Sequence, residues 1–76
     1  AACTNVIPNI HSTYVWKGKI VVDKECAMIV KTTSSKVRQA IQFIKSNHPY
    51  EQPAISAFAA SHVDKDFAKW VIGQTK

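Results

Sequence analysis

Glycine is scarce in this chain, and its scarcity excludes a class of nucleotide-binding site. Only Gly18 and Gly73 occur among the 76 residues, so no glycine-rich loop is available to hold phosphates. The stretch 16–19, Trp-Lys-Gly-Lys, fits a hairpin turn better than a phosphate-binding loop. Apolar runs are also short: none approaches the roughly 20 residues of a membrane-spanning helix, and no signal peptide is visible. We therefore expect a protein that does not span a membrane.

Acidic residues are few, and the basic residues are scattered along the chain. Ten Lys and Arg against five Asp and Glu give a net charge of +5, but no basic run resembles a nucleic-acid-binding arm. A solvated surface explains this charge, so we expect no nucleic-acid partner. With 46% hydrophobic and 20% charged residues, the composition is typical of a globular protein, and we interpret residues 1–76 as a single domain.

Cysteine is equally sparse. Cys3 and Cys26 are the only two and form no CxxC pair, so neither a zinc ribbon nor a thioredoxin-like site is supported. In the strand register derived below, Cys26 faces Asn9 and Cys3 faces Thr32, which makes the two cysteines poor disulfide partners. Two unpaired thiols suit a reducing compartment, so we expect a cytoplasmic protein. The apolar run around Cys26 places this residue in the core, away from any catalytic role.

The chain does contain a long β-rich stretch, residues 12–32, divided by Lys17-Gly18. With these two residues as the turn, residue i faces residue 35 − i, so that Tyr14 lies opposite Val21. A type I turn with a bulge at Gly18 would shift this register by one residue. The first arm continues back through residues 3–7, with a break or bulge at Pro8-Asn9, to about 14 residues or roughly 45 Å.

The tip of this hairpin is apolar on both faces, whereas a strand with one solvated face alternates polar and apolar residues. The helix expected at residues 35–47 would measure roughly 20 Å, too little to cover so long a ribbon. We therefore expect the distal half to pack on another chain in an obligate oligomer. One face carries Tyr14, Trp16 and Val21, and the other carries Val15, Ile20 and Val22.

Apolar periodicity and turn residues predict the other elements. The charged stretch 23–25 is expected to interrupt the return arm and leave 26–32 as a third strand. The helix at 35–47, with N-cap candidates at 33–35, ends before Pro49, because the residue preceding a proline avoids the helical region.

A short strand is expected at residues 54–60, after a linker stiffened by two prolines. A second helix opens near Val63, with Asp64 or Asp66 as its cap, and ends at Gly73. The order of strand, long hairpin, helix, strand and helix indicates an α+β fold.

No combination of nucleophile, base and acid stands out, so we expect no enzymatic activity. Among the histidines, His48 differs from His11 and His62 because it ends a helix beside Tyr50 and Glu51. An imidazole and a carboxylate can ligate copper or zinc, but two donors are fewer than the about three or four that a site needs. The alternative is structural: His48 caps helix carbonyls and packs on Tyr50.

Five segments occur in an order and spacing that resemble the CutA family of divalent-cation tolerance proteins. They are Ala-Ala-Cys-Thr-Asn-Val-Ile-Pro at 1–8, the residues around Trp-Lys-Gly-Lys at 16–19, Ile-Val-Lys-Thr at 29–32, His-Pro-Tyr-Glu at 48–51, and Trp-Val at 70–71. The resemblance implies a ferredoxin-like antiparallel αβ sandwich assembled as a homotrimer through long hairpins. It also implies a role in copper and divalent-cation tolerance or PII-like signalling, and in animals the anchoring of acetylcholinesterase.

The resemblance also implies that the chain is a fragment lacking a first strand and helix and a C-terminal segment. Loss of that strand would leave a gap between residues 26–32 and 54–60, unless another segment fills it. The family's metal-binding cysteine lies on the missing strand, and Asn47 and Ala54 stand where some members carry His and Glu. Copper or another divalent cation nevertheless remains the cofactor that the resemblance suggests.

Two functions follow as hypotheses. In the first, a trimeric cation or ligand sensor uses a cleft between subunits. In the second, the same residues only lock the assembly or bind a protein partner. The candidate metal ligands are His48 and Glu51, and the candidate cleft and interface residues are Tyr14, Trp16, Lys19 and Tyr50.

Overall fold

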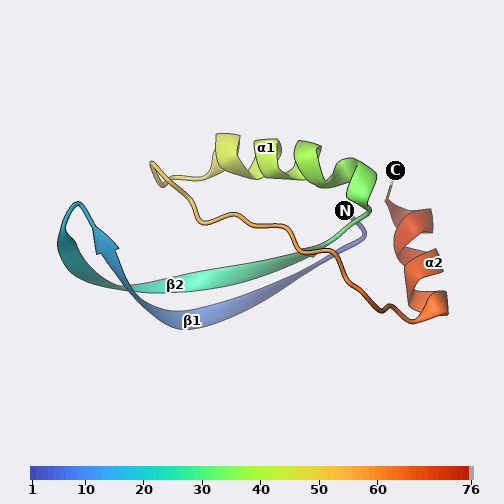
Figure 1. The fold of residues 1–76 in the computed structure, drawn as a ribbon, viewed down its shortest axis with the longest axis horizontal. Coiled ribbons are helices and arrows are strands. Elements are labelled where there is room, and N and C mark those ends of the chain that lie inside the picture. The colour runs from blue at the N-terminus through green and yellow to red at the C-terminus, as the bar shows by residue number, and fades with distance from the viewer. Residues whose placement is uncertain (76) are drawn as a thin grey trace.

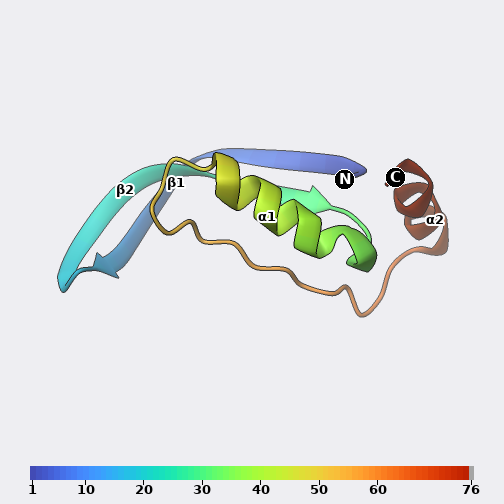
Figure 2. The ribbon, with the colours of Figure 1, turned by 90° about the horizontal axis from the view of Figure 1, so that it is seen from above.

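The computed structural model describes residues 1–75 and shows an α+β arrangement dominated by one long hairpin (Figure 1). The hairpin is a two-stranded antiparallel sheet, with helix α1 (Val37–Asn47) alongside its base half and helix α2 (Lys65–Gln74) at the far end from the tip (Figures 1 and 2). The tip projects beyond the end of α1, as the length comparison predicted. The elements are β1 Cys3–Trp16, β2 Lys19–Lys31, the 3₁₀ turn η1 Ser34–Lys36, α1 Val37–Asn47 and α2 Lys65–Gln74.

The turn of the hairpin follows from its two residues. Lys17 and Gly18 have φ angles of 51° and 78°, both in the left-handed region that a two-residue type I′ turn requires. Glycine adopts this region without steric cost, whereas Lys17 does so at some expense. Tyr14 pairs with Val21, so the predicted register of the tip is confirmed.

A bulge interrupts β1 where proline was expected to disturb it. The register shifts between Ile7 and Ile10, and Asn9 has a φ of 61°. Proline has no N–H to donate to the ladder, so an extra residue beside it is an ordinary solution. Beyond the bulge Cys3 pairs with Lys31, and not with Thr32 as an unshifted register predicted.

The expected interruption of the return arm is wrong. β2 runs without a break from Lys19 to Lys31, and Asp23, Lys24 and Glu25 pair with residues 12, 11 and 10 of β1. Ladder hydrogen bonds use only main-chain groups, so charged side chains do not break a strand when its partner continues beside them. The predicted third strand at 26–32 is therefore the second half of β2.

The two helices begin in different ways. The Asp64 side chain accepts a hydrogen bond of 3.0 Å from the Phe67 main-chain N–H, which confirms it as the cap of α2. Thr33 precedes η1 without a side-chain capping bond. The predicted end at Gly73 is wrong: α2 reaches Gln74, and the Thr75 N–H bonds to the Val71 carbonyl. None of the helices in residues 1–75 has the length and apolar character of a membrane span.

Residues 54–60 do not form the predicted strand. The segment carries no strand assignment and runs as irregular chain between the turn after α1 and α2 (Figure 1). The ladder in the described part of the chain joins only β1 and β2. A strand needs a partner for its main-chain groups, and no segment within residues 1–75 pairs with this one.

No apolar side chain among residues 1–75 is buried. The chain exposes 6693 Å², whereas a compact protein of 8.4 kDa would expose about 4,600 Å². The radius of gyration is 14.9 Å, against about 11.4 Å expected for a compact domain of this length. The excess of about 2,000 Å² is comparable with the total area of a specific protein interface.

Candidate functional site

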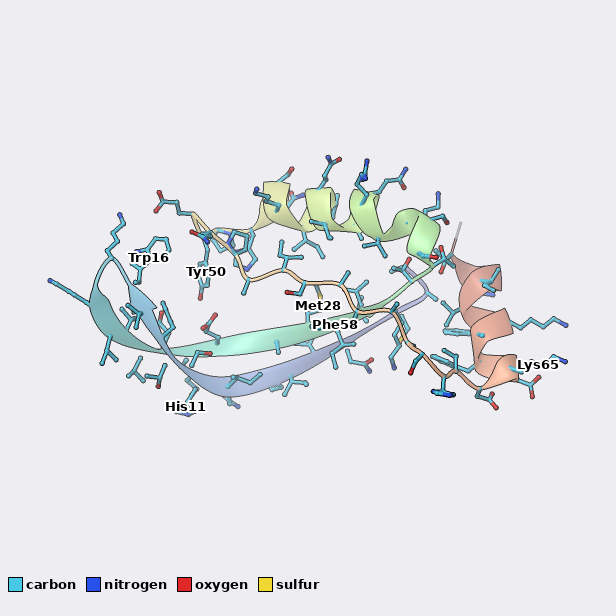
Figure 3. All side chains as sticks on the ribbon, viewed as in Figure 1. His11, Trp16, Met28, Tyr50, Phe58 and Lys65 are labelled. Carbon is cyan, nitrogen blue, oxygen red and sulfur yellow. The ribbon has the colours of Figure 1, made fainter. Side chains whose placement is uncertain are left out.

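One open groove of about 1150 Å³ brings together most of the residues singled out in the sequence. We call it the central groove; it is bounded by the hairpin, α1 and residues 48–58. The candidate residues that line it are Tyr14, Trp16, His48, Tyr50 and Glu51. Figure 3 shows Trp16 and Tyr50 on the same side of the hairpin, where the chain leaves α1.

A phenol–carboxylate pair forms the hairpin wall of the groove. The Tyr14 hydroxyl donates a hydrogen bond to the Asp23 carboxylate at 2.5 Å. This hydrogen bond, with partial burial and the negative charges of Asp23 and Glu25, raises the pKa of Tyr14 to about 12. Tyr14 is therefore a neutral, oriented donor at neutral pH, and Asp23 is its fixed acceptor.

The opposite wall begins at the end of α1, where His48 and Tyr50 form a small turn. Their rings meet edge to face, with centroids 4.7 Å apart and planes at 67°. The main-chain N–H of Tyr50 donates to Nδ1 of His48 at 3.1 Å. The Glu25 negative charge, followed by partial burial, raises the pKa of Tyr50 and ties this wall electrostatically to β2.

The sequence reasoning missed Asp23 and Glu25, both of which line the groove. Strand periodicity could have found them. Side chains two residues apart share a face, so Asp23 and Glu25 follow Val21 on the face that carries Tyr14. Their charges instead suggested an interruption of the strand.

Trp16 and Lys19 are neighbours in the ladder, but only Trp16 lines the groove. Trp16 is half-buried, and Lys17 places its Nζ 5.6 Å from the centre of the Trp16 ring, within reach of a cation–π interaction. Lys19 lies exposed at the tip.

The other candidate residues lie in separate places. His11 pairs with Lys24 on an exposed stretch of the hairpin, and His62 contacts Ser61 through Nδ1 at 3.1 Å. Cys26 lines the groove and is exposed, so its predicted place in the core is wrong. Cys3 and Cys26 are both free thiols, as expected from their register.

The donors in residues 1–75 do not fit a self-contained divalent-metal site. No group of three or more His, Cys, Asp or Glu side chains converges there. A divalent metal site built from His and carboxylate side chains needs about three or four such ligands. Ligation by His48 and Glu51 stays a prediction that would require donors from elsewhere.

Comparison with known proteins gives a consistent result along the chain. A family model described as the CutA1 divalent ion tolerance protein matches residues 1–74. A protein from Xenopus laevis named Protein CutA homolog is 42% identical over 71 residues, which are 93% of this chain and 47% of that protein. The divalent-cation tolerance protein CutA of Escherichia coli is 38% identical over 71 residues, 93% of this chain and 63% of the relative.

A solved structure extends this similarity to the fold. The PII-like protein CutA from Nostoc, in apo form, superposes with a TM-score of 0.92 at 28% identity. The match covers 99% of this chain and 73% of the Nostoc chain. The chain thus spans about half to two thirds of the two curated relatives and about three quarters of the Nostoc structure.

Proposed function

Because this chain belongs to the CutA1 divalent-ion tolerance family, we propose that it works as a non-catalytic homotrimeric module of divalent-cation response. In this proposal the hairpins assemble the trimer, and the central groove becomes a cleft that senses a small ligand or a divalent cation. The two free thiols support a place in a reducing cytoplasm.

One observation carries the proposal: the hairpin tip exposes apolar side chains that its own chain leaves uncovered. Val15, Ile20 and Val22 are 70%, 77% and 66% exposed, and they occupy one face of the ribbon. Burial of such side chains is worth about 1.5–3 kcal/mol each. Because Val21 and Trp16 lie on the opposite face, a partner on one side alone would leave apolar surface in water.

The groove chemistry supports recognition and gives no sign of catalysis. Tyr14 offers a neutral hydroxyl beside Asp23 and Glu25, which present fixed negative charge. Such walls suit a cation or a ligand rich in hydrogen-bond donors. The description of the Nostoc relative as PII-like supports a signalling reading of the same cleft.

A second candidate function is an interaction module that assembles, binds a protein partner and binds no metal. The absence of three converging metal donors within residues 1–75 favours it. In this version His48, Tyr50 and Trp16 stabilise the assembly, as in the acetylcholinesterase-anchoring role that the resemblance to this family suggests.

Two measurements on one set of proteins separate the candidates. Analytical ultracentrifugation compares wild type with Trp16→Ala, and isothermal titration with Cu²⁺ compares wild type with His48→Ala. An intact trimer with weakened ligand binding in Trp16→Ala supports a sensor, whereas loss of the trimer supports a purely structural role. Identical Cu²⁺ affinities for wild type and His48→Ala would reject His48 as a ligand.

A further inference from the structure

The turn at the end of α1 is closed by a histidine ring nitrogen. α1 ends at Asn47, whose side-chain amide donates to the Phe43 carbonyl at 2.8 Å. His48 then adopts an extended backbone, with φ −85° and ψ 137°, before Pro49. The N–H of Tyr50 returns to Nδ1 of His48. A side chain thus accepts from the main chain two residues later, the pattern by which Asn and Asp close turns.

This hydrogen bond determines where the imidazole carries its proton. A neutral histidine has one ring nitrogen that donates and one that accepts. Since Nδ1 accepts from Tyr50, the proton of the neutral ring must lie on Nε2. The lone pair of Nδ1 is engaged, and Nε2 has none to offer. In the closed turn neither nitrogen is free to bind a metal ion.

We propose that His48 locks the turn at residues 48–50, and that this lock and a divalent cation at His48 exclude one another. A cation on Nε2 moves the ring proton to Nδ1, where it faces the Tyr50 N–H, donor against donor. A cation on Nδ1 displaces the Tyr50 N–H directly. Either route opens the turn.

Opening the turn would change the central groove, because Tyr50 lines that groove. The Tyr50 ring makes an edge-to-face contact with the His48 ring, and the negative charge of Glu25 on β2 raises the pKa of the Tyr50 hydroxyl. Loss of the Tyr50 N–H bond therefore frees the aromatic wall that faces the hairpin. This inference rests on the proposed function in one respect, because it treats the central groove as the ligand site. If a cation binds His48, the turn opens and the shape of the groove changes.

Two substitutions at one position separate the acceptor from the ring. Asn in His48→Asn keeps an acceptor oxygen on Cγ, where Nδ1 stands, but lacks Nε2. His48→Ala removes both. We expect the Tyr50 amide to exchange about tenfold faster in His48→Ala than in wild type, a factor that corresponds to one hydrogen bond of typical net strength. His48→Asn should stay close to wild type.

The ring itself is followed by ¹⁵N NMR of the wild-type chain at pH 8, where free imidazole is neutral. Without metal we expect the Nε2–H tautomer. The probe is Zn²⁺, which is diamagnetic. Zn²⁺ should either leave the His48 nitrogens unshifted or convert the tautomer while the Tyr50 amide loses its protection. Both results support mutual exclusion.

Three results would overturn the lock. They are an Nδ1–H tautomer without metal, an unchanged Tyr50 amide in His48→Ala, and Zn²⁺ coordination at His48 with the Tyr50 amide still protected. None of these readouts depends on trimer formation or on groove binding. A monomeric chain with the lock intact would reject the proposed function alone, and a trimer without the lock would reject this inference alone.

Discussion

The hairpin and residues 54–60 were both predicted to be extended strands, but they have different structures. In the hairpin, a type I′ turn brings two arms together, so that each arm supplies the other's main-chain partners. Residues 54–60 consist of small and apolar residues, yet they pair with no strand in the described part of the chain. Apolar composition does not by itself make a strand, because the main-chain groups of a strand need a partner beside them.

The two halves of the hairpin also differ in how their own chain covers them. The base half of the hairpin lies beside α1, whereas the tip projects beyond it (Figure 1). A charge placed on the tip is the most direct test of this difference.

Val22→Asp should weaken self-association about 100-fold, because an unpaired carboxylate in an apolar interface costs about 3 kcal/mol. Gln42→Asp is the control, since Gln42 is exposed on α1 and lies outside the central groove. Sedimentation velocity across a dilution series measures both. Equal association of the two variants would show that the tip face is not an interface.

The glycine in the hairpin turn should matter more to the stability of the fold than the glycine in α2. Gly18→Ala should lower the free energy of unfolding by about 1–2 kcal/mol, because Ala is strained at a φ of 78°. Gly73→Ala is the opposite control: Gly73 lies inside α2 with open space around it, so the change should stabilise by up to about 1 kcal/mol. Urea unfolding measures both, and equal signs would contradict the account.

The two helix starts provide a matched pair. Asp64→Ala removes the capping bond to Phe67 and should cost about 1 kcal/mol, seen as faster amide exchange throughout α2. Thr33→Ala should change exchange in α1 very little, because Thr33 makes no side-chain capping bond. A larger effect from Thr33→Ala than from Asp64→Ala would contradict this, because Asp64 makes a side-chain capping bond and Thr33 does not.

The smallest effect concerns the phenol–carboxylate pair. In the folded state the pKa of Tyr14 is about 12, whereas in the unfolded chain the phenol loses its proton near the ordinary tyrosine pKa of 10.0. Between these values the folded state binds more protons, so stability falls as the pH rises through this window. Phenolate absorbance should show the Tyr14 midpoint returning toward 10.0 in Asp23→Asn. An unchanged midpoint would mean that Asp23 does not hold the phenol.

Much of the fold could be predicted because its causes are local. Lys17-Gly18 specifies the turn and its register, Pro8 marks the bulge, and Asp64 marks the start of α2. Each depends on the conformational limits or hydrogen-bonding capacity of residues close in sequence. Membership of the family was predicted from five short segments in order, and the family model that matches residues 1–74 confirms it.

The errors arose where tertiary context decides. Asp23 and Glu25 did not break β2, because a continuing partner strand held their main chain in place. Gly73 did not end α2, because glycine ends a helix only when the chain turns left-handed there. Cys26 lies in an apolar run but is exposed, since burial depends on what covers a strand and not on the strand itself.

Sedimentation equilibrium of the wild-type chain at micromolar concentration measures the assembly itself. Our account is that the hairpin tip is covered by other copies of this chain. It predicts a mass three times the 8.4 kDa of one chain, with no dissociation on dilution through the micromolar range. A mass of 8.4 kDa would contradict it, because the apolar tip would then be stable in water without a partner.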